Sequence, residues 1–204
     1  MSIYLPTNLG YQAGRPRLNK PVSMSRYGNR AISMIQNGDE WWTVNIETQP
    51  LYDEQLAAFE GWLAQAKNGL ETVVYTVLGR QSVPLAYWSD PNNAAITGNP
   101  MLTVINGSIL TISPVVVGLK MKSGDLIGFS NGEYNFFTRI IADATASSTL
   151  LQVVVEPFLP SYITIGSTVR LKDAKINTRV VPGSTEVGEG VMPTVKFQLI
   201  EVPK

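Results

Sequence analysis

The side chains available for chemistry in this sequence are mainly carboxylates, because two residue types that enzymes use most often are missing. The 204 residues contain no histidine and no cysteine. Catalytic dyads and triads that need an imidazole or a thiolate are therefore excluded within the chain. The usual zinc sites lose both of their preferred ligands. The absence of cysteine also excludes a disulfide framework.

Carboxylates leave one route to catalysis, the acid and base pair of sugar hydrolysis. The candidate pairs are Asp39 with Glu40, Asp125 with Glu133, and Asp143 with Glu156. A structural role is favoured, because Gly38-Asp39-Glu40 and Ser123-Gly124-Asp125 have turn composition. Neither a phosphate-binding glycine-rich motif nor an SxxK motif occurs. We therefore expect no enzyme, no catalytic residue, no cofactor and no metal site.

One stretch, Glu133 to Ile141, combines aromatic and basic side chains. Alternation places Tyr134 and Phe136 on one face of an expected strand. Phe137 and Arg139 share the other face. Barrels that bind single-stranded nucleic acid stack bases on such aromatics along a basic groove, so these four residues are a candidate ligand face. The alternative is that one face is core and the other ordinary surface. Nearby acids almost cancel the basic residues, whereas nucleic-acid binding requires a basic excess.

Charge is uneven near the N-terminus, although the whole chain is neutral with 16 basic and 16 acidic residues. Residues 1–30 carry five basic residues and no acid, and residues 31–71 carry seven acids and a single lysine. These are either two solvated faces or a basic arm that docks on the acidic part of a neighbouring subunit. The candidate subunit-interface residues are Arg15, Arg17, Arg26, Arg30 and Trp41.

Trp41 is included because strand alternation points it away from Trp42, which should face the core. Exposed large aromatics often mark interfaces. The alternative is that Trp41 faces a second sheet of the same sandwich.

One convincing helix lies within Leu51 to Gly69, with its regular part expected over residues 53–67. Phe59 and Leu63 recur at helical spacing, and Trp62 widens this apolar stripe. A helix this short is marginal alone in water, so the stripe must pack on a sheet.

Strands are expected on both sides of this helix. Arg30 to Gln36 and Trp41 to Glu47 are expected to pair through a loop at residues 37–40. Leu70 to Leu78 follows the helix, and residues 174–181 and 193–202 would complete its sheet.

The intervening stretch shows short strands and no helical pattern, which is typical of a small antiparallel barrel. The predicted fold is mainly β. A discontinuous β-sandwich domain with one α-helix uses residues 1–80 and 173–204. An inserted OB-like barrel uses residues 100–172, and residues 81–99 form a linker.

The layout resembles a known family. Residues Trp41 to Leu78 contain a strand beginning WW, then a helix of the type LxxxxLAAFxxWL that ends in glycine and leads into a strand. LKMKSGDLI follows in Leu119 to Ile127, and EPFLP in Leu151 to Pro160. This arrangement is similar to that of distal tail proteins of long-tailed bacteriophages (siphophages), over nearly the whole chain.

The resemblance implies a structural virion protein of the tail tip, or baseplate. Such proteins assemble through the β-sandwich into a homo-oligomeric ring, usually a hexamer. The ring lies between the tail tube protein and the tail hub protein that carries the receptor-binding apparatus. It keeps a channel open, through which DNA passes without specific binding.

The resemblance also implies assembly in the host bacterial cytoplasm. Neither a secretory signal nor a run of about 18 apolar residues is visible, so we expect no membrane insertion. The alternative function is a monomeric binding module that uses the OB-like barrel for oligosaccharide or single-stranded nucleic acid.

Overall fold

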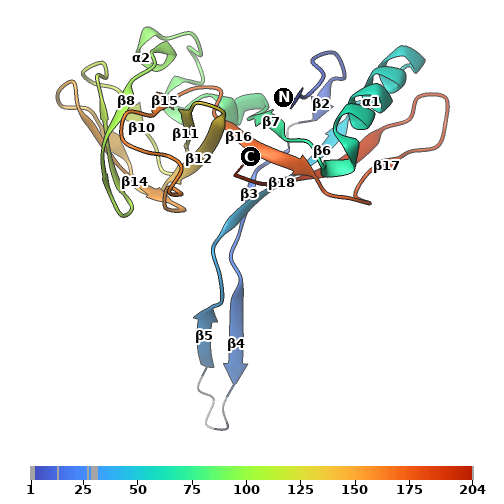
Figure 1. The fold of residues 1–204 in the computed structure, drawn as a ribbon. Coiled ribbons are helices and arrows are strands. Elements are labelled where there is room, and N and C mark those ends of the chain that lie inside the picture. Colours follow the sequence, from blue (N-terminus) through green and yellow to red (C-terminus); the bar gives the residue numbers. More distant parts are fainter. Residues whose placement is uncertain (1–2, 13, 27, 29–31, 204) are drawn as a thin grey trace.

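A computed structural model describes residues 3–12, 14–26, 28 and 32–203. It is mainly β, with one main helix, sheets in a sandwich-like arrangement and a closed six-stranded antiparallel barrel, which confirms the predicted fold class. The helix lies at one end of the molecule and the barrel at the other, with the large sheet between them (Figure 1). In the described part of the chain, no helix is long and apolar enough to span a membrane.

The large sheet combines strands from both ends of the chain. Its order is β1-β7-β16-β18-β6-β2, and β3 pairs with β6 while β17 pairs with β18. The strands are β1 (Ile3–Tyr4), β2 (Tyr11–Gln12), β3 (Arg17–Asn19), β6 (Trp41–Thr48), β7 (Val73–Thr76), β16 (Lys175–Val180), β17 (Glu186–Val187) and β18 (Val195–Glu201). The barrel strands are inserted between β7 and β16.

The main helix, α1 (Asp53–Gln65), begins and ends at recognisable signals. The Tyr52 N–H donates to Oε1 of Gln55 at 3.1 Å, which satisfies one free group of the first turn. After α1 the chain passes through the 3₁₀ turn η1 (Lys67–Gly69), where Asn68 and Gly69 have φ values of 51° and 93°. Such left-handed residues stop a helix, so the predicted helix is confirmed with its end two residues earlier.

The barrel closes in the order β11-β12-β14-β9-β8-β15. Its strands are β8 (Met101–Asn106), β9 (Ile109–Ser113), β11 (Leu126–Asn131), β12 (Tyr134–Ile140), β14 (Leu151–Glu156) and β15 (Thr168–Arg170). A small pair, β10 (Lys120–Met121) and β13 (Ala144–Thr145), lies beside it. Gly107 and Gly132 are the first central residues of two tight hairpins, with φ of 57° and 60°. A positive φ there matches the twist of the flanking strands.

The connector between sheet and barrel contains three short helices. These are η2 (Gly79–Ser82), η3 (Leu85–Tyr87) and α2 (Ala94–Thr97). Asp125 attaches the connector to the barrel, because its Oδ1 accepts from Leu85 N at 2.8 Å and its Oδ2 from Lys122 N at 2.7 Å.

One continuous apolar face of the sheet packs against both the helix and the barrel. Phe197 on β18 lies opposite Ile46 of β6, and its ring is 5.5 Å from that of Phe59 on α1. Farther along the same face of β6, the Trp42 ring meets Phe137 of β12 edge-on at 5.0 Å. The barrel and the helix are therefore attached to opposite ends of one surface, as Figure 1 shows.

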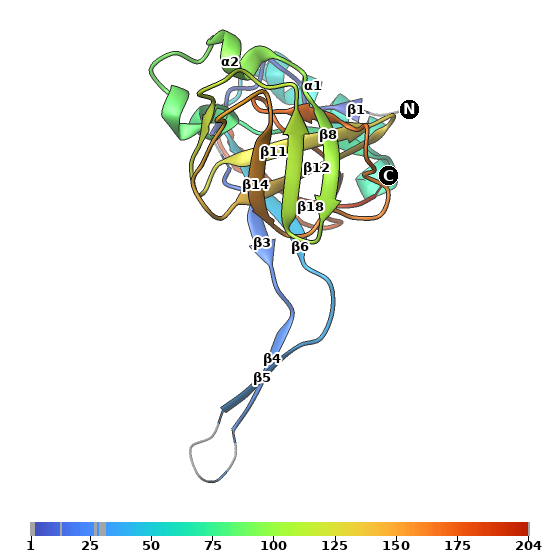
Figure 2. The ribbon, with the colours of Figure 1, turned by 90° about the vertical axis from the view of Figure 1, so that its left-hand side faces the viewer.

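Two further strands, β4 (Val22–Arg26) and β5 (Ile32–Gln36), pair with each other and form an arm outside the large sheet. Figures 1 and 2 show the arm projecting away from both the sheet and the barrel. The predicted pairing of residues 30–36 with 41–47 is wrong. Residues 37–40 continue the chain from β5 into β6 without reversing it, and Asn37 N donates to Pro21 O at 2.8 Å across the arm.

Candidate assembly interface

One face of the arm is mainly apolar, and the other carries three serines and Ile35. In its register Met24 lies opposite Met34, and Arg26 lies opposite Ile32. Facing residues of an antiparallel pair point to the same side, so these side chains share a face with Val22. We define the apolar arm face as Val22, Met24, Ile32 and Met34, whose side chains are 50 to 65% exposed. The residues of the opposite face are Ser23, Ser25, Ser33 and Ile35.

Sequence reasoning did not identify β4, although the signal was present. The segment VSMSR alternates larger side chains with serine, which is the period of a strand with one covered face. The matching ISM at the start of β5 has the same alternation. A strand pair that presents such a face without cover from the rest of its own described chain indicates an interaction surface.

The predicted interface residues do not gather at one place. Arg26 lies on the arm and is exposed. Arg17 on β3 lies opposite Thr43, and Trp41 opposite Asn19, so both face away from the side of β6 that packs on the barrel. Trp42 is 1% exposed and Trp41 37%, as strand alternation predicts. Arg30 lies outside the described residues.

Arg15, the remaining candidate, is exposed and lines a groove between the sheet and the barrel. Arg139 and Trp88 line the same groove, which has a volume of about 450 Å³. The interface candidates are therefore spread over the arm, the outer face of the sheet and this groove.

The candidate ligand face of β12 is largely enclosed. Phe136 and Phe137 are 2% and 0% exposed. Phe137 packs on Trp42, and the Arg139 guanidinium lies 5.2 Å from the centre of the Trp42 ring. Tyr134 is half-buried and stacks on Tyr162 with ring centres 5.2 Å apart. These rings join the barrel to the sheet and fill the barrel, so they form no exposed platform on which bases could stack.

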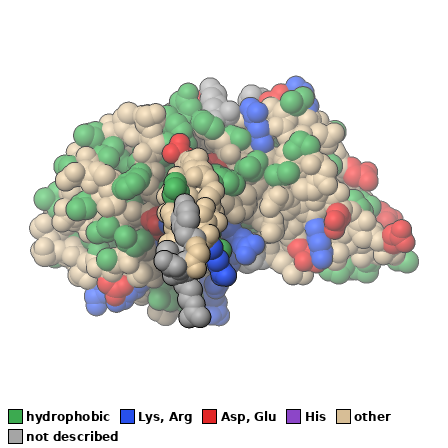
Figure 3. All heavy atoms as spheres, turned by 90° about the horizontal axis from the view of Figure 1, so that it is seen from below, with side chains coloured by type: hydrophobic (Ala, Val, Ile, Leu, Met, Phe, Trp, Pro, Cys, Tyr) green, Lys and Arg blue, Asp and Glu red, His purple; other side chains and the backbone are tan. Residues whose placement is uncertain are grey.

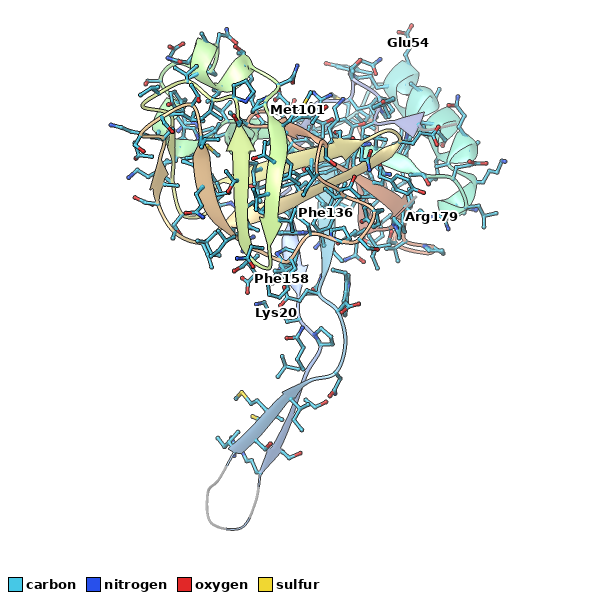
Figure 4. The ribbon with its side chains drawn as sticks, turned by 60° about the vertical axis from the view of Figure 1, so that its left-hand side comes forward. Lys20, Glu54, Met101, Phe136, Phe158 and Arg179 are labelled. Carbon is cyan, nitrogen blue, oxygen red and sulfur yellow. The ribbon has the colours of Figure 1, made fainter. Side chains whose placement is uncertain are left out.

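A groove of about 420 Å³ lies where the arm, the barrel and the end of β18 meet. We call it the junction groove. Its lining residues are Gln36, Asp39 and Glu40 from the arm side, Phe136, Pro157, Phe158, Leu159, Pro160 and Tyr162 from the barrel, and Glu201 and Pro203 from the C-terminal segment. In Figure 4, Phe158 and Lys20 lie at the lower end of the barrel, where the arm begins.

The acidic side of this groove is incompletely paired. Lys20 Nζ lies 3.2 Å from Glu40 Oε1 and also contacts Glu156. The other Glu40 oxygen, Oε2, is buried and has no hydrogen-bond partner among the described residues. Glu201 Oε2 accepts from Trp42 N at 2.8 Å. Burial nevertheless raises the pKa of Glu201 from its ordinary 4.5 to about 7.

Glu201→Gln is expected to raise stability at alkaline pH. A carboxyl whose pKa is raised by folding stabilises the fold fully below pH 4.5, and this contribution is lost as pH rises through about 7. A Gln oxygen can still accept from Trp42 N. We therefore expect the variant to be more stable at pH 8 by about 1–3 kcal/mol, which is roughly 2–10 °C in melting temperature.

The measurement is thermal unfolding of dilute protein at pH 4 and pH 8. The two chains should melt together at pH 4. An equal difference at both pH values would show that burial of the Glu201 charge is not the cause. Glu47→Gln, at an exposed ion pair with Lys196 at 3.4 Å, is the control and should change the melting temperature little at either pH.

Two of the other carboxylates considered for catalysis, Asp125 and Asp143, have structural partners. Both oxygens of Asp125 accept backbone N–H groups, and burial raises its pKa. Asp143 accepts from Lys122 Nζ at 2.5 Å and from Ser123 N at 2.9 Å, which together lower its pKa. Within residues 3–12, 14–26, 28 and 32–203, no three His, Cys, Asp or Glu side chains are grouped so that they could hold a metal ion.

Comparison with known protein families finds none that matches this chain, and a search of curated proteins finds no match either.

Proposed function

We propose that the protein is a structural subunit of a bacteriophage tail tip, a distal tail ring protein that connects the tail tube to the hub. Six copies would form the ring and leave a channel for DNA, as the resemblance in sequence layout implies. The observation that carries the proposal is the projecting arm with its apolar arm face exposed. The work of such a protein is geometric and needs no active site.

Contact with a partner chain would stabilise an arm of this kind. A two-stranded hairpin is marginally stable by itself in water. The four side chains of the apolar arm face still expose half or more of their surface. Covering them would contribute up to roughly 1 kcal/mol for each side chain. A repeated contact of this size, together with the sheet surface around Trp41, supports assembly into a ring.

The shape of the chain also allows a head-to-tail ring. The arm projects from one side of the body, and the viewpoint from below shows it standing out over the sheet and barrel (Figure 3). If the arm contacts a different surface on the next copy, the interface is head-to-tail. Head-to-tail interfaces generate rings when the rotation closes.

Native mass separates this proposal from its alternative. A hexamer of the 22.3 kDa chain has a mass of about 130 kDa, to be measured by light scattering over a range of concentrations. A chain that stays at 22.3 kDa throughout and binds an oligosaccharide or single-stranded oligonucleotide would instead support the monomeric binding module.

Replacing Met24 and Met34 together by serine is expected to shift the assembly toward single chains. The two side chains face each other on the apolar arm face, so both contacts are lost at each interface. The dissociation constant should rise by about 10- to 100-fold. The control is the double variant Ser25→Thr and Ser33→Thr, which changes the opposite face of the same strands. If both double variants kept the native mass of the unchanged chain at every concentration, the apolar arm face would not be part of the interface.

A further inference from the structure

We infer that the junction groove is the binding site for the arm of a neighbouring copy, so that the inserted barrel is part of the assembly interface. The inference rests on the proposed function and names the contact that closes the ring. It assigns a role to the barrel loop of residues 157–160, which lines the junction groove.

The apolar side of the groove matches the apolar arm face in chemistry. Pro157, Leu159 and Pro160 line it together with the rings of Phe158 and Tyr162. Phe158 is 67% exposed in the single chain, which is unusual for a phenylalanine. Methionine side chains adapt well to irregular aromatic surfaces and make favourable sulfur contacts with rings. Met24 and Met34 would supply these contacts from the arm.

The acidic side of the groove matches the charge of the arm. Asp39, Glu40 and Glu201 line the groove, and the nearest cation, Lys20, already contacts Glu40 and Glu156. The arm brings Arg26 on the same side as its methionines, and the sequence has no acid before Asp39. A guanidinium in the groove would lie near the negative charge of these carboxylates. It would also lower the pKa of Glu201 toward its ordinary value.

Geometry requires that the arm come from another molecule. The groove lies at the foot of the arm, beside Lys20, and its lining includes Gln36 at the base of β5. Arg26 is six residues farther along an extended strand, at roughly 20 Å from Lys20. The arm projects away from the groove in both ribbon views (Figures 1 and 2). It therefore cannot fold back into its own groove without losing the β4–β5 pairing.

Thiol crosslinking tests this contact directly, because the chain has no cysteine of its own. One chain carries Met34→Cys and a second, separately purified chain carries Phe158→Cys. The two are mixed and treated with a short thiol-to-thiol crosslinker. We expect at least tenfold more linked pairs than in a control mixture of Met34→Cys with Val191→Cys. Val191 is 92% exposed and lies away from the junction groove.

A second measurement uses Phe158→Ser in the otherwise unchanged chain. Because Phe158 is mostly exposed, the melting temperature of the dilute protein should stay the same. The dissociation constant of the assembly should rise about tenfold or more. Val191→Ser should leave both quantities unchanged.

The outcomes separate this inference from the proposed function. Preferential crosslinking at Phe158 together with weaker assembly of Phe158→Ser supports the groove as the arm's binding site. An assembly near 130 kDa that lacks either result overturns the inference and leaves the ring intact. A chain that remains at 22.3 kDa at every concentration overturns both.

Discussion

Phe59→Ala is expected to lower the free energy of unfolding by about 3–5 kcal/mol, the usual cost of removing a buried ring. Phe59 is 1% exposed and lies 5.6 Å from the Trp62 ring and 5.5 Å from the Phe197 ring. This cluster is the main attachment of α1 to the sheet. A loss of this size is a large share of the 5–15 kcal/mol that stabilises a typical domain.

The measurement is equilibrium unfolding in urea, followed by circular dichroism. Leu70→Ala is the control, because Leu70 directly follows the 3₁₀ turn after α1 but is 73% exposed. It should change the free energy by no more than about 0.5 kcal/mol. If Phe59→Ala behaved like Leu70→Ala, α1 would not depend on the sheet, and the packing of helix on sheet would need another explanation.

Elements defined by local sequence could be predicted, and elements defined by a choice of partner could not. The helix was predictable because Phe59 and Leu63 repeat at helical spacing and Asn68-Gly69 ends it. The barrel hairpins were predictable because Asn-Gly at residues 106–107 and 131–132 favours tight reversal. In both cases the decisive interactions lie within a few residues.

The arm shows why pairing is harder to predict. β5 has β4 before it and β6 after it, and both are strand-like segments within hairpin distance. Local patterns do not decide between them. The structure pairs β5 with β4, and β6 with β3 and β18, because β6 carries the Trp42 face that the barrel and helix cover. Contacts with Phe137 of β12 and with strand β18, both far along the chain from β6, therefore decide the pairing.

The environment of the site residues was harder still to predict from the sequence. Alternation along β12 correctly separates Phe136 from Phe137, but it cannot show that both faces are covered, one inside the barrel and one on Trp42. Glu201 gave no signal, because a single carboxylate at the end of a strand has no pattern. Its raised pKa depends on burial at the meeting point of three distant segments.

Trp42→Ala is expected to uncouple the barrel from the sheet as well as to destabilise the protein. Trp42 is 1% exposed, and it contacts Phe137 of β12 edge-on while Arg139 lies over its ring. Removing the indole should cost about 3–5 kcal/mol. Because this cost falls on the contact between two parts that each have their own strands, unfolding should change from one transition to two.

Two matched substitutions test that explanation. Trp42→Phe keeps a ring against Phe137, and the indole Nε1 has no hydrogen-bond partner to lose among the described residues, so this variant should retain a single transition at a smaller cost. Trp41→Ala, at the next position but on the outer face of β6, should change the free energy by no more than about 1 kcal/mol. The transitions can be followed in urea by tryptophan fluorescence and circular dichroism. A single transition for Trp42→Ala, at the midpoint of Trp41→Ala, would mean that the contact between barrel and sheet does not depend on Trp42.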